Sequence, residues 1–238
     1  MFGDGRQYTI GVFVIGAGAS GTARTAPNSW QGSKIYVPGG SSGYTLAFTM
    51  KVTPGTSYSY VVGAGGNAVT SVTGNNGGSS SFGGKAAEGG GAGKVGEGGV
   101  TAGVGGQVII MDSDANPYGG IIGTLGSSDD NSLISDILSC FNPFTGQRIL
   151  GAGGSASGSS TPTSYPAGKN KITGLGGGNA ATSTSAAANV KGLDAAEPGC
   201  GGGAAFRVYP SSSSVTGTTT SGKGADGAVY LYVLGDPA

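Results

Sequence analysis

Short runs of apolar residues, separated by polar and glycine-rich stretches, dominate the chain. The first run, Tyr8–Ile15, is rich in β-branched and aromatic residues and predicts a strand. Runs at 44–52 and 56–62 predict a further pair of strands. The Thr-Pro-Gly sequence at 53–55 between them predicts a turn, because proline presets φ and glycine supplies a positive φ.

Residues 44–52 alternate between apolar and small or polar side chains. The apolar set is Leu46, Phe48 and Met50, and the alternate set is Thr45, Ala47, Thr49 and Lys51. Successive side chains of a strand point to opposite faces of its sheet. We therefore expect one face of this strand to be buried and the other to face water.

Further strands are predicted at 79–82, 107–111, 205–209 and 228–234. The last of these and the first strand of the chain are its most hydrophobic segments. We expect the two to pair or pack together, which would bring the ends of the chain near one another.

One segment has helical spacing. Apolar residues recur at the intervals of an α-helix between 132 and 141, and they are Leu133, Ile134, Ile137, Leu138 and Phe141. Asp129 and Asp130 stand where a helix N-terminus favours acids. We expect one short helix near 130–141, and Leu133, Ile137 and Phe141 are candidates for assembly with a partner or a second copy.

Glycine supplies 53 of the 238 residues and arrives in blocks, among them 89–91, 176–178 and 201–203. Glycine loses the most backbone entropy on folding, so these blocks need a structural reason. Extended glycine helices of the polyproline-II type, with three residues per turn, can pack side by side through backbone hydrogen bonds. A valine in the middle of a block should then abolish folding, whereas Gly217, in a polar loop, should tolerate substitution.

Charge and composition narrow the function classes. Twelve basic residues balance twelve acidic ones and charged residues make up only 10%, so we expect no nucleic-acid partner. The apolar runs are too short to cross a membrane, and the start lacks the features of a signal peptide. Histidine is absent, which removes the commonest general base. We expect no enzyme, cofactor or metal site. The pairing of Cys140 with Cys200 is left open.

Three motifs resemble ligand sites but lack essential parts. Residues 16–21 carry Gly-x-Gly-x-x-Gly after a strand, without the helix and acid of a dinucleotide site. Residues 217–224 resemble a phosphate loop without its magnesium-binding hydroxyl. Residues 112–116 imitate the start of a calcium loop, but Pro117 takes the place of its glycine. Asp226 is expected in a turn.

Several aromatic residues lie in or beside polar segments. Tyrosine among Ser, Gly and Asn is typical of loops that bind varied surfaces. The alternative is that each ring covers the edge of a small core. The candidates for receptor binding, in the polar loops 24–37, 156–170 and 209–222, are Trp30, Tyr36, Tyr165 and Tyr209.

The order of these elements resembles a known family. The matching parts are the start at 8–18, the Val-Thr-Pro-Gly…Tyr…Val-Gly-Ala-Gly-Gly segment at 52–66, the Gly-Gly-Ser-Ser-Ser-Phe-Gly run at 77–83, and the closing Gly-Ala-Asp-Gly-Ala-Val at 224–229. These segments are similar to the glycine-rich domain of tailed-phage tail fibres and related adhesins. Residues 107–150 depart from that pattern and are expected to be an insertion.

The resemblance implies a mainly β fold over residues 1–238: one jelly-roll-like β-sandwich that frames packed glycine helices. It implies a non-enzymatic protein of the virion surface or the extracellular space, made in the cytosol. The expected partner is a host cell-surface receptor, either protein or glycan. The alternative is a purely structural fibre, head-decoration or filament subunit that associates with other virion proteins or copies of itself.

Overall fold

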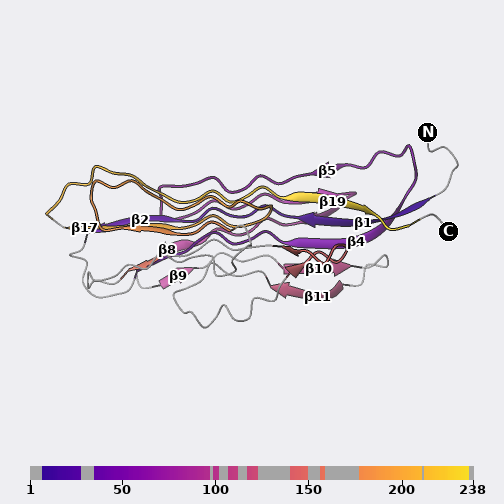
Figure 1. The fold of residues 1–238 in the computed structure, drawn as a ribbon, viewed down its shortest axis with the longest axis horizontal. Helices are drawn as coiled ribbons and strands as arrows, with labels where there is room; N and C mark the ends of the chain where they lie inside the picture. The colour runs from indigo at the N-terminus through magenta and orange to yellow at the C-terminus, as the bar shows by residue number, and fades with distance from the viewer. Residues whose placement is uncertain are drawn as a thin grey trace.

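The structure is a computed structural model that describes residues 7–27, 35–96, 99–101, 107–111, 117–122, 140–149, 156–158, 177–210 and 212–235. The regular structure in these ranges is entirely β, which confirms the prediction of a mainly β chain. Within the same ranges, no helix is long and apolar enough to cross a membrane. Figure 1 shows an elongated molecule in which the largest sheet lies at one end and long extended segments run to the other.

The largest sheet has five strands. In spatial order they are β11 (Pro117–Ile122), β10 (Gln107–Met111), β4 (Thr45–Val52), β1 (Tyr8–Ile15) and β19 (Ala228–Val233). β1 pairs antiparallel with β19, from Ile10 opposite Val233 to Ile15 opposite Ala228. The expected pairing of the first and last strands is therefore confirmed, and the start of β1 and the end of β19 both lie at this end of the molecule (Figure 1).

A three-stranded sheet covers one face of the large sheet. Its strands are β5 (Tyr60–Val61), β6 (Ser80–Phe82) and β7 (Lys85–Ala87), in that order. β6 lies against β1 and β19, while β7 lies against β1 and β4. The side chains between the two sheets form one apolar cluster of Ile10, Val12, Val14, Leu46, Phe48, Phe82 and Ala87.

The opposite face of the large sheet is covered as well. Phe13, Ile15 and Ala47 are buried there, with Phe144 and Tyr232 packed against them. Thr45 and Ala47 are each only 1% exposed, so the prediction that alternate residues of β4 face water is wrong for its first half. The cause is Phe144, which comes from the segment expected to be an insertion.

That segment contributes directly to the sheet. β10 pairs parallel with β4, and β11 pairs antiparallel with β10. Farther along, the side-chain amide of Asn142 donates a hydrogen bond of 2.6 Å to the hydroxyl of Tyr232. Residues 107–149 thus supply two strands and part of the cover of the large sheet.

The helix prediction is wrong where the structure tests it. Phe141 belongs to β12 (Cys140–Phe141), which pairs antiparallel with β13 (Arg148–Ile149). The N–H of Gly146, at a φ of 67°, donates to the carbonyl of Asn142, and this turn chemistry favours a hairpin over a continued helix. Leu133 and Ile137 lie outside the described residues.

The end of the molecule opposite the termini has its own small core. β2 (Ala23–Pro27) and β15 (Ala181–Ser183) flank β17 (Ala205–Tyr209) in a parallel sheet. Two-stranded pairs join it: β3 (Ile35–Val37) with β14 (Ala156–Gly158), β8 (Lys94–Gly96) with β9 (Gly99–Thr101), and β16 (Val190–Lys191) with β18 (Thr219–Thr220). Its apolar cluster contains Ala26, Val37, Val95, Ala204, Phe206 and Val208. We call this end the distal end.

Replacing Phe48 with alanine should lower the free energy of unfolding by about 3–5 kcal/mol, because the ring is 2% exposed and its loss leaves a cavity between the two sheets. The matched control is Leu193→Ala, since Leu193 is 56% exposed and its truncation should cost less than about 0.5 kcal/mol. Chemical denaturation measures both. Equal losses for the two variants would contradict this packing.

Candidate functional site

Extended glycine-rich segments connect the two ends of the molecule, as the parallel ribbons of Figure 1 show. The innermost of them is residues 16–22, which lead from β1 to β2, and every residue in it is buried. It carries no large side chain, so its backbone is the only surface that its neighbours can contact.

The N–H groups of this central segment donate to three neighbouring segments in strict rotation. Every third donor goes to the same neighbour: Gly16, Ala19 and Thr22 to residues 38–44, Ala17, Ser20 and Ala23 to residues 71–78, and Gly18 and Gly21 to residues 222–225. The distances run from 2.8 to 3.1 Å, which is ordinary hydrogen-bond geometry. A repeat of three residues therefore governs the bonding.

The carbonyl groups of the same segment face a different set of neighbours. Ala17 accepts from Gly90, Gly18 from Gly66, and Ala19 from Gly202. The central segment is thus bonded on all sides, with three segments accepting from it and three donating to it. This satisfies buried backbone groups that would otherwise carry a large desolvation cost.

Glycine is required at several positions of this arrangement because a Cβ atom would not fit there. A Cβ on Gly18 would lie less than 3.0 Å from the carbonyl of Cys200, a buried residue, and a Cβ on Gly43 would overlap the carbonyl of Gly16. The same holds within the predicted blocks at Gly90, Gly178 and Gly202. Two of these blocks are direct neighbours, since the N–H of Gly178 donates to the carbonyl of Gly201.

The surroundings of Gly217 contradict the prediction made for this position. A Cβ there would overlap the carbonyl of Ala188, and the carbonyl of Gly217 accepts a hydrogen bond of 2.7 Å from Arg207. The expected tolerance of this position is wrong, because the polar loop packs on another loop and on a buried side chain.

Two of the sequence motifs are accounted for by the same bonding. The Gly-x-Gly-x-x-Gly run at 16–21 leads into another extended segment, and its N–H groups are bonded to neighbouring carbonyls. In the run at 217–224, Ser221, Gly222 and Gly224 donate to Val69, Gly203 and Gly66. Neither run offers backbone donors to a phosphate. The calcium-like run at 112–116 lies outside the described residues.

Side chains as well as carbonyl groups accept from backbone N–H groups in the bundle. Asp226 Oδ1 accepts from the N–H of Gly65 at 2.8 Å, and Asp194 Oδ1 accepts from the N–H of Lys223 at 2.8 Å. Asp226 lies in an extended segment rather than the expected turn. Asn76 and Ser221 do the same for Ala92 and Val69. This use explains part of the polar, weakly charged composition.

Asp194 also interacts with two lysine residues, Lys191 and Lys223. The ammonium of Lys191 lies 3.0 Å from its Oδ2. Burial raises the pKa of Asp194, but the hydrogen bonds from Lys223 and Lys191 and the charges of both lysines outweigh it and hold the pKa below the ordinary value. Within the described residues, no three His, Cys, Asp or Glu side chains gather as metal ligands would.

The distal end holds a buried cation. Arg207 on β17 is 2% exposed. Its guanidinium donates to the carbonyls of Ala188 at 2.8 Å and Gly217 at 2.7 Å. The side chain therefore ties together the loops that precede β16 and β18, using backbone carbonyls as partners.

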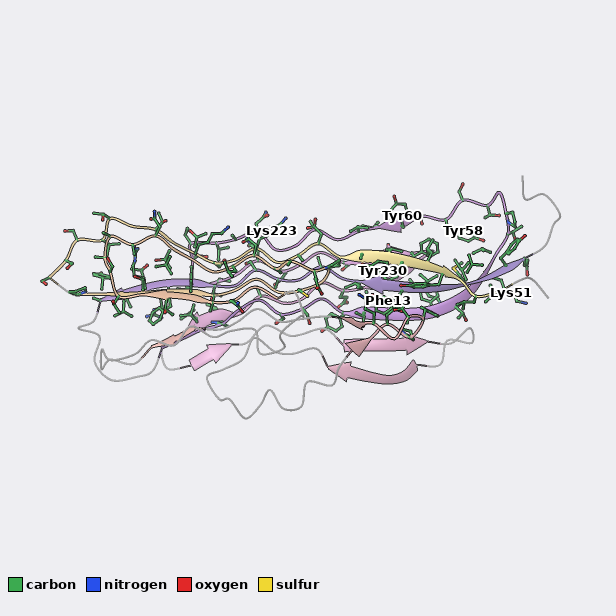
Figure 2. All side chains as sticks on the ribbon, in the orientation of Figure 1. Phe13, Lys51, Tyr58, Tyr60, Lys223 and Tyr230 are labelled. Atoms are coloured by element: carbon green, nitrogen blue, oxygen red, sulfur yellow. The ribbon has the colours of Figure 1, made fainter. Side chains whose placement is uncertain are left out.

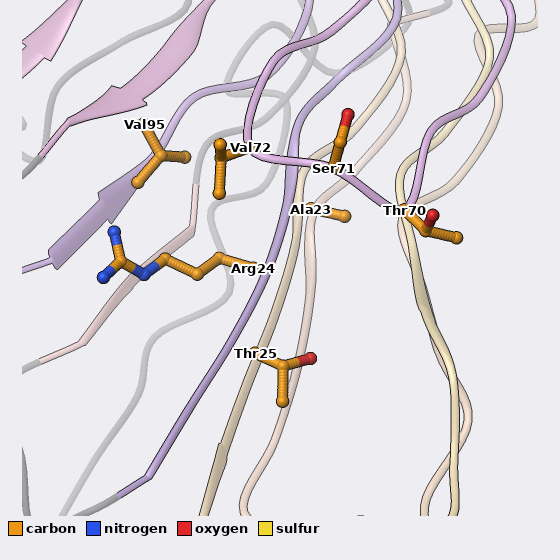
Figure 3. Close-up of a pocket in the computed structure, with 7 residues that line it drawn as sticks. All are labelled: Ala23, Arg24, Thr25, Thr70, Ser71, Val72 and Val95. Carbon is orange, nitrogen blue, oxygen red and sulfur yellow. The ribbon is translucent and has the colours of Figure 1, made fainter.

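An open hollow of about 660 Å³ lies beside this core (Figure 3). Its lining comes from β2, from the turn that precedes the bridge at Thr73, and from β8: Ala23, Arg24, Thr25, Thr70, Ser71, Val72 and Val95. Figure 3 shows the Arg24 side chain extending along the hollow toward Val95. Hydroxyl groups, a guanidinium and two valines together suit a ligand with both polar and apolar parts.

The predicted receptor-binding residues come from strands that lie together at the distal end. Tyr209 ends β17, is partly buried, and stands opposite Pro27 of β2. Tyr36 lies in β3 opposite Ser157 of β14. Trp30 and Tyr165 lie outside the described residues, as does the side chain of Tyr36.

The sequence analysis missed a set of exposed apolar residues at the other end. Seven of them lie on or directly after two edge strands, β5 and β19: Tyr60, Val61, Val62, Tyr230, Leu231, Val233 and Leu234. The sequence signal was present, since strands with no charge or proline suit pairing.

Gly18→Ala should lower the free energy of unfolding by at least about 2 kcal/mol, because the methyl group would push residues 16–22 and 199–203 apart and break the bonds between them. Asn67→Ala, on the exposed side of a neighbouring glycine segment, should change it by less than about 0.5 kcal/mol. Thermal unfolding compares the two. A tolerant Gly18 would contradict the close backbone packing.

Asp194→Asn should destabilise the protein near neutral pH and have little effect in acid. A carboxyl whose pKa is lowered in the folded state adds stability above its unfolded pKa of about 3.9 and loses it as the pH falls through the folded value. Melting temperatures of both proteins from pH 7 to pH 2 test this. The two curves should converge below about pH 4, and a constant gap would contradict it.

Comparison with known proteins gives a single positive finding. No curated protein matches the chain. A family model described as the glycine-rich domain matches residues 5–234. That range contains the large sheet, the bonded glycine segments and the distal core. The chain therefore belongs to the glycine-rich domain family.

Proposed function

We propose that the chain is a non-enzymatic adhesin of the phage tail-fibre type, displayed on a virion surface or released from the cell, and that its distal loops bind a host cell-surface receptor. The resemblance of its motifs to tail-fibre domains motivates the proposal. The observation that carries it is that the strands from which the three polar loops leave lie together at one end of the molecule.

The roots of these loops lie on neighbouring strands. The loop at 24–37 leaves from β2 and returns in β3, the loop at 156–170 begins with β14, and the loop at 209–222 begins at the end of β17. β2 pairs with β17 and β3 pairs with β14. A rigid scaffold that presents several loops on one surface is the usual architecture for recognition.

A polyglycine-II bundle framed by a β-sandwich is the scaffold that we infer. Its support is the repeat of three in the donors of residues 16–23 and the crowding around their glycines. A second support is exposure at every third residue in an outer segment, at Ala64, Asn67 and Thr70. The packing of β5, β6 and β7 on the large sheet supports the sandwich.

The hollow beside β2 supports a receptor with polar groups. Thr25, Thr70 and Ser71 carry hydroxyl groups, and Arg24 adds cationic donors that can hydrogen-bond a glycan or an acidic loop. The opening is large enough for a sugar unit or a side chain. A structural fibre or decoration subunit is the second candidate, and the exposed edges of β5 and β19 favour it.

Replacing 159–170 and 212–216 with short Gly-Ser links should remove binding to host cells, because the proposed contact surface is lost while the bonded segments remain. The measurement is flow cytometry of the labelled protein on a panel of bacterial strains, together with a glycan array. The melting temperature should fall by only a few degrees, corresponding to about 1 kcal/mol.

The control replaces residues 53–57 with a Gly-Ser link. This turn follows β4 near Lys51, at the end opposite the loops (Figure 2), and its replacement should leave binding intact. If the loop-deleted protein still bound the same cells, or the intact protein bound none of the strains and glycans, the receptor-binding proposal would fall and the structural candidate would replace it.

A further inference from the structure

The two sheets at the end near the termini leave one flank open. β19 is an edge strand of the large sheet and β5 is an edge strand of the small one. Because β6 lies against β1 and β19 while β7 lies against β1 and β4, β5 falls on the β19 side. Figure 1 shows β5 and β19 along the same margin of the molecule. We call this margin, with its seven exposed apolar residues named above, the open flank.

The flank exposes several large apolar side chains. Val233 is 77% exposed, Tyr60 is 67% and Leu231 is 52%. Natural proteins protect edge strands with charges, proline or a covering segment. β5 and β19 contain no charged residue and no proline, and in the part of the chain that the structure describes, no strand pairs with the outer edge of β19.

Alternate residues of β19 have backbone N–H and C=O groups free to pair with another strand. The N–H of Leu234 donates to the carbonyl of Thr9, which fixes the parity of the antiparallel ladder with β1. Residues 234, 232, 230 and 228 are therefore bonded to β1. The alternate residues Val229, Leu231 and Val233 direct their N–H and C=O groups to the free edge.

The sequence of this edge is a palindrome. Residues 229–233 read Val-Tyr-Leu-Tyr-Val. In an antiparallel pair centred on Leu231, Val229 would face Val233 of the second copy and Tyr230 would face Tyr232. Residues opposite each other in such a pair lie on the same face, so valine and leucine meet on one face and tyrosine meets tyrosine on the other.

We propose that the open flank is a self-association interface, in which β19 of two copies pairs antiparallel about a two-fold axis at Leu231. The paired strands would join the two large sheets into one and bring β5 of each copy toward the junction. A second copy is the occupant that these features favour, because the edge is neutral, so no like charges meet, and its side-chain order matches its own reverse. The interface lies away from the distal loops, so it is independent of receptor binding.

Leu231→Lys tests the pairing in the full-length protein. Two ammonium groups would stand opposite each other at the axis, and we expect dimerisation to weaken by about tenfold or more in sedimentation velocity over a concentration series. Leu193→Lys is the matched control, since Leu193 is 56% exposed against 52% for Leu231 and lies in a glycine segment. It should dimerise like the wild type, and all proteins should keep the wild-type circular dichroism spectrum.

A charge swap makes the test specific to two-fold symmetry. The Leu231→Glu variant alone should dimerise as weakly as the Leu231→Lys variant. An equimolar mixture of the two variants should regain dimers, because opposite charges then face each other. Leu231→Cys should also form a disulfide-linked dimer on mild oxidation, since opposite Cα atoms in a bonded pair lie about 5.5 Å apart. Leu193→Cys reports any crosslinking through the native cysteines.

The proposal is overturned if the wild type stays monomeric up to about 1 mM, if Leu231→Lys associates as the wild type does, or if Leu193→Lys weakens association equally. It is also overturned if the charge-swapped mixture fails to dimerise or if open-ended polymers replace dimers. Loss of cell binding with dimerisation intact would bear only on the distal loops, so the two proposals fail separately.

Discussion

Hydrogen bonding between the backbones of segments that are distant in sequence is the constraint on which the structure depends. Residues 16–22 donate to three segments and accept from others, and a methyl group on Gly18 would already occupy the space of the Cys200 carbonyl. Ordering so much glycine costs conformational entropy. The compensation comes from the hydrogen bonds between buried backbone groups, with the apolar clusters at the two ends adding hydrophobic burial.

The same constraint explains the distribution of side chains. The central segment 16–22 contains only Gly, Ala, Ser and Thr, and the large buried apolar residues gather in the clusters at either end. Between some segments, side chains of Asp194, Asp226 and Ser221 accept backbone N–H groups that are not bonded to a neighbouring carbonyl. Polar residues that look like a featureless surface in the sequence thus complete the bonding of the backbone.

The sequence predicted the parts of the fold that side chains encode. β1, β4, β10, β17 and β19 fall on the apolar runs, and the pairing of β1 with β19 followed from their hydrophobicity. The failures have a common cause in contacts over long distances. Nothing local to β4 announced that Phe144 would cover its second face, and the helical spacing that ends at Phe141 carried no sign of the hairpin closed by Asn142 and Gly146.

The candidate surfaces depend on contacts between distant segments as well, so the sequence predicted them only in part. The polar loops could be named from composition, but the placing of the strands that bear them at one end required the pairing of β2 with β17 and of β3 with β14. Which glycine segment bonds to which could not be predicted, because Gly16, Ala17 and Gly18 donate to Tyr44, Gly78 and Ala225 without any side chain to specify the choice. The register is set from the ends instead: β1 fixes where residues 16–22 begin, and β2 and β17 fix where they finish. The backbone hydrogen bonds of the bundle link the two ends of the molecule along its length. They therefore set the distance between the strands that bear the polar loops and the large sheet, where the uncharged edge of β19 is exposed.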